Sequence, residues 1–209
     1  MVLGIDMDDT ICSTNEMILI EAGQYDQEVL GGTGVKNAEA YEFTEMMGWE
    51  QDQKGKFFAD RLETIMKEAP IKTHAKEVIN KLHDEGWKIV IISFRKDKYL
   101  PDPYGMTKKW LEDNGIKYDK LFVNTGTKTD ECIENNVTLF IDDKESHCED
   151  VSKAGIDVLL FTNYYNQKEK RFDRVDNWDE VYDYIKEKYN GWKSCNKPWI
   201  RIRYIWENY

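Results

Sequence analysis

The most informative segment of this chain is near its start: Val2-Leu3-Gly4-Ile5-Asp6-Met7-Asp8-Asp9-Thr10. Its apolar start predicts a short buried strand, and a cluster of acids follows at once. Because residues two apart in an extended segment point the same way, Asp6 and Asp8 converge. Neighbouring carboxylates repel each other, and a hard cation with oxygen ligands, above all Mg²⁺, relieves that repulsion. Taken alone, the stretch also fits a solvated acidic turn.

Further apolar runs follow, separated by amphipathic patterns. The clearest run is Trp87 to Phe94, whose centre Ile89-Val90-Ile91-Ile92 is typical of a buried parallel strand. Strands and helices then alternate, which predicts an α/β fold with a doubly wound, Rossmann-like parallel sheet and a site at the carboxyl ends of its strands. The other expected strands are 121–123, 137–141 and 158–161, and the helices between and after them are 74–85, 104–114, 128–135, 144–154 and 178–188.

The segment from Ser13 to Thr73 interrupts this alternation. It contains no strand pattern and predicts three helices inserted after the first strand, where they can act as a lid over that strand's carboxyl end. The run Gly31-Gly32-Thr33-Gly34 fits a flexible turn better than a phosphate-binding loop, because no strand precedes it and no Gly-Lys-Ser/Thr follows it. The three expected helices are 17–22, 38–47 and 51–67.

These patterns divide the chain into three parts. We expect an α/β core of residues 1–12 and 74–188, a helical cap of residues 13–73, and a C-terminal extension of residues 189–209 whose role is open. The extension is basic and aromatic, and Ile200 to Trp206 begins with the alternation of a strand.

Composition and charge limit the function. The chain has 209 residues and a formal net charge of −11, which disfavours binding to nucleic acid or anionic membrane. No apolar run is long enough to span a bilayer, and the start does not resemble a signal peptide. The four scattered cysteines, Cys12, Cys132, Cys148 and Cys195, form no CxxC pair, which favours reduced thiols and a cytoplasmic protein. A homo-oligomer stays open.

Other polar residues stand at the expected strand ends. Ser93 ends the run of residues 87–94, Asp142-Asp143 follows the strand of residues 137–141, and Lys128 precedes that strand. Each has a simple alternative reading, as a helix N-cap, an acidic helix start or a surface lysine. Together at the mouth of one sheet they predict a site. Cys12 is interpreted as a packing residue, and His74, His83 and His147 as ordinary helix residues without ligand spacing.

The order of these residues resembles the four motifs of the haloacid dehalogenase-like (HAD) hydrolase superfamily. The motifs are Asp6-Met7-Asp8-Asp9-Thr10, Ser93, Lys128 and Asp142-Asp143, and the resemblance covers residues 1 to about 188. The superfamily places its helical C1-type cap between motifs one and two, where this chain has its insertion. Asp9 departs from the usual Gly, and Ser93-Phe94-Arg95 stands where Thr-Ala-Arg is frequent.

The resemblance implies a phosphomonoester hydrolase. Asp6 would attack phosphorus and form an aspartyl-phosphate. Asp8 would protonate the leaving oxygen and then deprotonate water, and this second acid favours phosphoryl chemistry over dehalogenation. Lys128 would offset negative charge. A Mg²⁺ cofactor would be held by the Asp6 carboxylate, the Asp8 carbonyl, Asp143 and, as support or through water, Asp142. The substrate's phosphoryl group would bind Ser93, Phe94, Arg95 and Lys128, with help from backbone N–H groups.

The sequence indicates the reaction more clearly than it indicates the substrate. Met7, the short gap between Lys128 and Asp142, and Trp178 in the last helix are similar to pyrimidine-type 5′-deoxyribonucleotidases and related bacterial nucleotidase-like proteins. We therefore expect a small phosphorylated substrate, a nucleotide. A sugar-phosphate or metabolite phosphatase, a polynucleotide-end phosphatase and a non-catalytic phosphate-binding module are alternatives. In the cap, candidates for base contact, or simply for the cap's own core, are Phe43, Trp49, Phe57 and Phe58; Lys56 and Arg61 are candidates for a polar contact.

Overall fold

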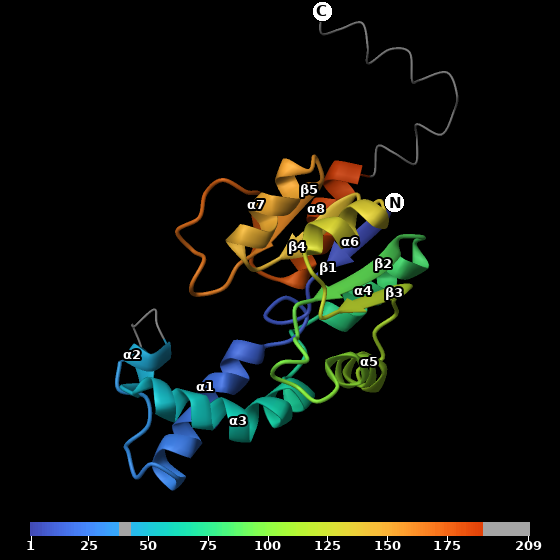
Figure 1. Cartoon of the computed structure of the whole chain (residues 1–209). Helices are drawn as coiled ribbons and strands as arrows, with labels where there is room; N and C mark the ends of the chain where they lie inside the picture. Colours follow the sequence, from blue (N-terminus) through green and yellow to red (C-terminus); the bar gives the residue numbers. More distant parts are fainter. Residues whose placement is uncertain (38–42, 190–209) are drawn as a thin grey trace, which may run out of the picture.

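The computed structural model describes residues 1–37 and 43–189. Six parallel strands form one sheet in the order β3-β2-β1-β4-β5-β6 (Figure 1). The strands are β1 Val2–Ile5, β2 Lys88–Ser93, β3 Lys120–Val123, β4 Leu139–Asp142, β5 Asp157–Phe161 and β6 Arg174–Val175. The helices are α1 Thr14–Glu28, α2 Phe43–Met47, α3 Gln51–Glu68, α4 Ala75–Asp84, α5 Pro103–Asp113, α6 Lys128–Glu134, α7 Glu145–Lys153 and α8 Trp178–Tyr189.

Both faces of the sheet are buried, because successive side chains of a strand point to opposite faces. In β2, Ile89 and Ile91 join a cluster that includes residues of α4, α5 and α8, whereas Val90 and Ile92 join a cluster with residues of α6 and α7. Apolar side chains are therefore needed at all four central positions, 89 to 92, as the continuous apolar run indicated. The doubly wound α/β fold is confirmed.

The site lies where the chain reverses its direction of winding. β1 stands at the centre, with β2 and β3 on one side and β4, β5 and β6 on the other. The backbone N–H of Asp6 donates to the carbonyl of Ile141 at 2.9 Å, so the carboxyl ends of β1 and β4 are held side by side. In a sheet of this kind the crevice at such a reversal is where ligands bind.

The segment between β1 and α4 forms a separate helical layer beyond the end of β1 (Figure 1). Helices α1, α2 and α3 bury an apolar cluster of their own, which we call the cap cluster: Ala22, Tyr25, Met47, Trp49, Phe57 and Ile65. The two chain segments that join this layer to the core lie against each other. Ser13 N donates to Pro70 O, and Lys72 N donates to Ile11 O, both at 2.8 Å.

Several elements differ from the sequence expectation. Helix α1 covers 14–28 instead of 17–22, because polar residues that blur its periodicity, among them Glu21 and Asp26, are buried against partners in the cap. The strand β6 was not expected, and its two residues are too few to carry a pattern. Of the helix expected over 38–47, residues 38–42 lie outside the described part of the chain, as does the tail of residues 190–209 with its alternating stretch.

The glycine-rich segment is a turn, as expected. The backbone N–H of Gly34 donates to Asp26 Oδ2 at 2.8 Å, and that of Gly32 donates to the Asp26 carbonyl, also at 2.8 Å. Gly31 and Gly34 have positive φ angles of 69° and 89°, which glycine adopts without strain. These hydrogen bonds fold the turn back against the last part of α1.

Candidate active site

Three carboxylates from the ends of two neighbouring strands form the centre of the site. Asp6 follows β1, Asp142 ends β4, and Asp143 follows it; each offers an oxygen within 4.8 Å of the other two. We call these three residues the carboxylate cluster. All three are buried. Burying charge in this way is costly unless cations compensate it, so the cluster requires positive charge nearby.

Lys128 supplies part of that charge. It is the first residue of α6, its side chain is 2% exposed, and its ammonium donates to Asp6 Oδ1 and, at 2.7 Å, to Asp142 Oδ2. Burial alone would lower the pKa of Lys128, but the carboxylates beside it raise that pKa above its ordinary value. The lysine therefore stays charged, and one ammonium faces three carboxyl groups.

The remaining negative charge shifts the pKa values of the acids apart. Burial raises the pKa of Asp6 well above its ordinary value; Lys128 opposes this shift and the neighbouring acids add to it. Burial and the adjacent Asp142 raise the pKa of Asp143 to about 7. For Asp142, burial also acts upward, but Lys128 and His147 lower the pKa below the usual range. An excess of buried carboxyl groups with oxygen donors only fits a hard metal ion.

Asp8 lies two residues after Asp6 and pairs with an arginine. The Arg95 guanidinium donates to both carboxylate oxygens of Asp8, from Nη2 to Oδ1 at 2.8 Å and from Nε to Oδ2 at 3.0 Å. Thr14 Oγ1 also donates to Asp8 Oδ1, at 2.6 Å. Burial acts to raise the pKa of Asp8, but Arg95 and Thr14 lower it below its ordinary value. Asp8 is therefore ionised in this arrangement.

Arg95 makes a contact that the sequence did not indicate. We expected its guanidinium to contact the substrate, but the side chain is 1% exposed and is bonded to Asp8, to the Met66 carbonyl and to Thr107 Oγ1. A bidentate pair of this kind fixes the orientation of a carboxylate. Arg95 is thus a positioning residue for Asp8.

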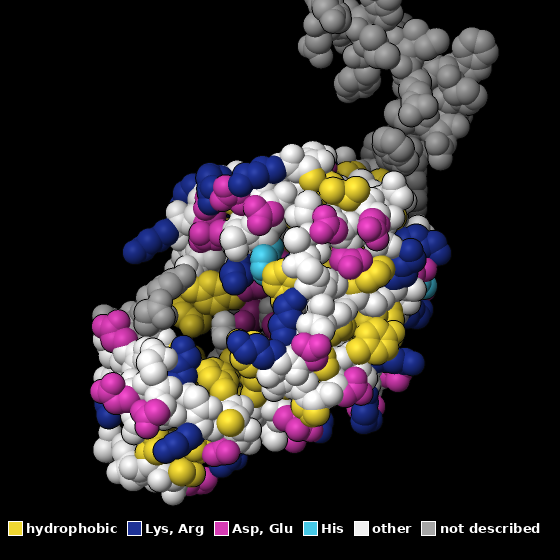
Figure 2. All heavy atoms as spheres, viewed as in Figure 1, with side chains coloured by type: hydrophobic (Ala, Val, Ile, Leu, Met, Phe, Trp, Pro, Cys, Tyr) yellow, Lys and Arg dark blue, Asp and Glu magenta, His cyan; other side chains and the backbone are white. Residues whose placement is uncertain are grey.

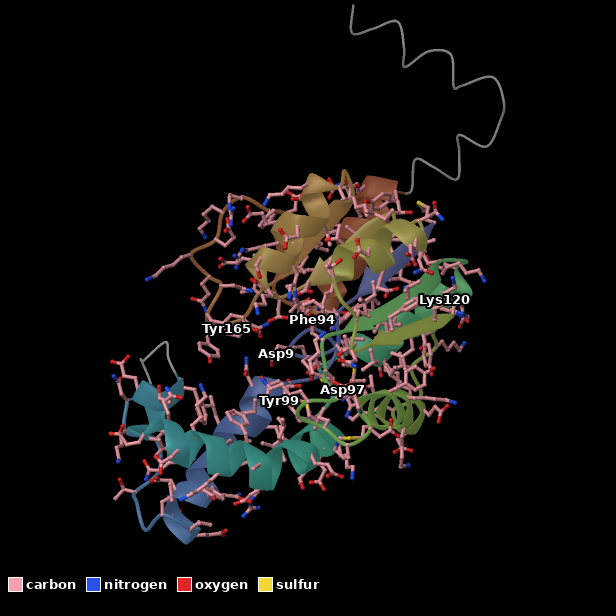
Figure 3. The ribbon with its side chains drawn as sticks, viewed as in Figure 1. Asp9, Phe94, Asp97, Tyr99, Lys120 and Tyr165 are labelled. Atoms are coloured by element: carbon pink, nitrogen blue, oxygen red, sulfur yellow. The ribbon has the colours of Figure 1, made fainter. Side chains whose placement is uncertain are left out.

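Ser93 and Phe94 lie at the end of β2 beside the cluster. Ser93 is fully buried, and its Oγ accepts from the backbone N–H of Arg95 at 3.3 Å. The Phe94 ring meets the His147 ring edge-on, with 4.8 Å between centroids, and lies 5.3 Å from Lys128 Nζ. Phe94 therefore covers one side of the lysine, at the edge of the core that faces the cap (Figure 3).

Asp9 stands where the HAD motif usually has Gly, and its backbone conformation shows why. It adopts a φ of +61°, a conformation that favours glycine, which is the usual residue at this place in the superfamily. The conformation is held from two sides: Asp9 Oδ1 accepts from Asn15 N at 2.9 Å, and Asn163 Nδ2 donates to the Asp9 carbonyl at 3.0 Å. Burial raises the pKa of Asp9 to about 6. Aspartate is among the residues that tolerate this conformation, so it can stand where glycine is usual.

Four residues at the site were not predicted. His147 lies on a helix, α7, as expected, but its Nδ1 is 2.9 Å from Asp142 Oδ2, a contact that the sequence did not indicate. Tyr165 donates its hydroxyl to Asp143 Oδ2, and Asn166 Nδ2 donates to the Asp143 carbonyl at 2.7 Å. Thr10 Oγ1 donates to Asp143 Oδ1 at 3.4 Å. The signal available for Tyr165 and Asn166 was their position just after the carboxyl end of β5.

The Cys12 thiol packs in the core as predicted, and of the other two histidines His83 lies on a helix but His74 does not. Burial raises the pKa of the Cys12 thiol, which keeps it protonated and makes it a packing residue. His74 precedes α4 and pairs with Asp179 at 2.7 Å, and His83 lies within α4. Neither belongs to the carboxylate cluster.

Most cap candidates face the interior of the cap. Phe57 and Trp49 belong to the cap cluster, and Trp49 Nε1 donates to Asp26 Oδ1 at 2.6 Å. Phe58 packs against the same cluster. Arg61 pairs with Glu21 at 3.3 Å, while Lys56 is exposed. These contacts match the alternative reading, in which the cap aromatics form the cap's own core.

Phe43 differs from the other cap candidates because it also lines a cavity of about 490 Å³ between the cap and the core. Tyr164, Tyr165 and Asn166 line the cavity from the core side, and Asp143 connects it to the carboxylate cluster. The surface is visibly hollowed between cap and core (Figure 2). A substrate that reaches the cluster through this opening meets both layers.

Comparison with known proteins agrees with this geometry. The profile of the family described as 5′ nucleotidase, deoxy (pyrimidine), cytosolic type C protein matches residues 1–189. The chain belongs to this nucleotidase family. It is therefore a phosphatase of the HAD superfamily, as the motif resemblance predicted. Nucleotidase CA_C3379 of Clostridium acetobutylicum is 28% identical over 153 residues, which are 72% of this chain and 77% of that protein.

Solved structures share the fold of this nucleotidase-family chain at low identity. A HAD-like family hydrolase from Streptococcus pneumoniae is 12% identical, with a TM-score of 0.61 over 88% of this chain and 97% of its own. YfnB from Bacillus subtilis, solved bound to magnesium, is 16% identical, with a TM-score of 0.59 over 88% of this chain and 98% of its own. Among the described residues, no helix has the length and apolar character to cross a membrane.

Proposed function

We propose that this chain is a Mg²⁺-dependent 5′-nucleotidase, with a preference for deoxynucleotides, that works through an aspartyl-phosphate on Asp6. The observation that carries the proposal is the pairing of Asp6 with Lys128 inside the carboxylate cluster, next to a second acid, Asp8, held by Arg95. A nucleophile and an acid–base group at adjacent positions suit two-step phosphoryl transfer. Membership of the nucleotidase family supports the substrate class.

The carboxylate cluster fits the metal that this proposal requires. Carboxylate oxygens from Asp6, Asp142 and Asp143 lie within 4.8 Å of one another, and the carbonyl of Asp8 follows in the same stretch. When bound there, Mg²⁺ supplies positive charge that offsets the phosphoryl oxygens and the carboxylates. Tyr165 and Thr10 bind the two oxygens of Asp143 and thereby fix its orientation toward the cluster.

In the first step, an oxygen of Asp6 attacks phosphorus and the bond from phosphorus to the ester oxygen breaks. Asp8 gives its proton to that leaving oxygen, so the nucleoside departs as an alcohol. Arg95 and Thr14 lower the pKa of Asp8 in the free protein, so Asp8 must take up a proton from water as the negatively charged phosphate approaches and raises that pKa. Lys128 offsets the charge on Asp6 and the phosphoryl group.

In the second step, water attacks phosphorus and the bond to Asp6 breaks, which releases inorganic phosphate and restores the carboxylate. Asp8, which is ionised after the first step, accepts the proton of that water and is thereby protonated for the next cycle. Ser93 and the backbone at Phe94 lie beside the cluster, where they can bind phosphoryl oxygens. Arg95 acts through Asp8, which revises its expected contact with substrate.

We further propose that residues 13–73 act as the cap of a core formed by residues 1–12 and 74–188. The cap cluster and the paired connections at Ser13 and Lys72 support this division. The cavity between the two layers supports a role of the cap in covering the substrate.

Phosphate release tests the function directly. The wild type is compared with Asp6→Asn on 5′- and 3′-deoxynucleotides, ribonucleotides, sugar phosphates and a 5′-phosphorylated oligonucleotide, with Mg²⁺ and with chelator. We expect Mg²⁺-dependent release that favours 5′-deoxynucleotides and falls at least about 10⁴-fold in Asp6→Asn. Circular dichroism checks that the variant is folded. Activity retained by Asp6→Asn would exclude the nucleophile, and preference for another compound would replace the substrate but keep the mechanism.

A further inference from the structure

The cavity beside Asp143 has aromatic walls from both layers of the protein. Phe43 contributes from the cap, and Tyr164 and Tyr165 contribute from the segment between β5 and β6. Its volume of about 490 Å³ lies within the range of small-molecule sites, roughly 300 to 1,000 Å³. We propose that this cavity receives the nucleoside part of the substrate, with the base stacked on Tyr164; the proposal rests on the nucleotidase function above.

The two tyrosines lie at different distances from the chemistry. Tyr165 donates its hydroxyl to Asp143, so its ring stands directly beside the carboxylate cluster. Tyr164 meets the Tyr165 ring edge-on, with 5.0 Å between centroids and an angle of 82°. Its side chain is one of the large hydrophobic residues that stay exposed. From the reacting phosphate outward, the phosphorylated sugar therefore passes Tyr165 first, and the base reaches Tyr164.

The segment that carries these rings is fixed before substrate arrives. Asn166 Nδ2 donates to the Phe161 carbonyl at 2.8 Å as well as to Asp143. Arg174 Nη2 donates to the carbonyls of Asn166 at 2.8 Å and Glu169 at 2.9 Å. A stacking surface that is held in place loses little conformational entropy when a ligand binds, so more of the contact appears as affinity.

The rest of the cavity suits the edge of a nucleobase. Lys144, Glu145 and Ser146 line it near the start of α7, and they offer charged donors, acceptors and a hydroxyl. A base has a flat π-face and a rim of donors and acceptors, whereas a sugar phosphate has no such face. The combination of aromatic walls and polar rim therefore favours a nucleotide over a base-free phosphomonoester.

A pair of substrates isolates the contribution of the base. We compare kcat/KM for 5′-deoxynucleotides with kcat/KM for 2-deoxyribose 5-phosphate, which carries the same phosphate and sugar without a base. Tyr164→Ala should lower the ratio of the two values about tenfold or more, mainly through a higher KM for the nucleotide. Tyr164→Phe, which keeps the π-face, should keep the ratio within about twofold of wild type.

Two further variants separate stacking from other effects. Tyr164→Leu keeps apolar bulk but removes the π-face, so the ratio should fall as in Tyr164→Ala. Tyr104→Ala is the matched control, because Tyr104 is exposed to a similar degree, 52% against 51%, but lies on α5 outside the cavity. Its ratio should equal that of the wild type. Thermal unfolding of each variant establishes that it is folded.

The outcomes keep this proposal distinct from the proposed function. A wild type that prefers nucleotides, together with unchanged ratios in Tyr164→Ala and Tyr164→Leu, would overturn the stacking site and leave the nucleotidase standing. A wild type that hydrolyses both substrates equally would overturn the nucleotide preference and the stacking site with it. A selective fall in the two stacking-deficient variants, with rescue by Tyr164→Phe, would establish the base site.

Discussion

The carboxylate cluster and the cap cluster are both buried, but their side chains are of opposite kinds. In the first, charged groups face one another across short distances, and Lys128 lies between Asp6 and Asp142. In the second, rings such as Tyr25 and Phe57 meet at 5.5 Å between centroids. Aromatic burial stabilises a fold, whereas a buried excess of charge of one sign lowers stability until a ligand or metal offsets it.

This contrast indicates how the two layers divide their tasks. The core contains the carboxylate cluster, and the apolar clusters on both faces of the sheet stabilise the core around it. The cap folds around its own cluster and meets the core through the paired connections and through α3, which packs against α5 and accepts a hydrogen bond from Arg95 at Met66. Changes in the carboxylate cluster should therefore alter chemistry first, and changes in the cap cluster should alter local stability first.

Of the three changes that probe this contrast, Lys128→Met should have the largest effect, because it removes the ammonium that faces the carboxylate cluster. Turnover should fall about 10²- to 10³-fold, because positive charge at the reacting group is lost. The free energy of unfolding in chelator should also fall, by about 3 kcal/mol, since two buried carboxylates lose their partner. Steady-state kinetics and urea denaturation measure the two effects. Lys108→Met, an exposed change on α5, is the control, and equal losses in both variants would contradict the assignment.

A smaller effect should follow Arg95→Met. Because Arg95 acts through Asp8, the single change should lower kcat about 10- to 100-fold, and the same change in an Asp8→Asn background should cost less than about threefold more. The four proteins of this double-mutant cycle are compared under saturating substrate. If Arg95→Met lowered kcat as much in the Asp8→Asn background as in the wild type, Arg95 would contact the substrate itself, as the sequence suggested.

The smallest effect on chemistry should follow Phe57→Ala. Phe57 is fully buried in the cap cluster, so the cap should lose about 3 to 5 kcal/mol of stability, while kcat on 2-deoxyribose 5-phosphate should change less than about fivefold. Hydrogen exchange should rise in residues 14–68 and stay slow in the strands. Phe140→Ala, the same change in a buried core residue, should instead speed exchange throughout the sheet. A uniform rise in Phe57→Ala would show that cap and core unfold together.

Much of the fold and part of the site could be predicted because the sequence signals are local. An apolar run followed by a polar residue indicates a strand and its end, and Ser93 and Asp142 stand at such ends. Parallel strands bring those ends to one edge, so their convergence follows from topology. The family resemblance then assigned them roles, which stay proposals here.

The remainder depends on contacts between distant segments. Tyr165 reaches Asp143 from the segment after β5, and no periodicity marks that contact. His147 lies on a helix at an ordinary spacing, and only the packing of α7 against β4 turns it toward Asp142. The pairing of Arg95 with Asp8 was not predicted for the same reason, because a sequence motif identifies a cation but not the carboxylate that it meets.

The adjacent connections of the cap have a consequence for protein engineering. The chain leaves the core at Ser13 and returns at Lys72, and hydrogen bonds hold the two crossings together. An insert whose ends already touch can be exchanged for one of another length without stretching its host, as successful domain insertions show. The stretch between these crossings is therefore a natural graft point, where a foreign cap could redirect substrate choice while the sheet and its acids stay untouched.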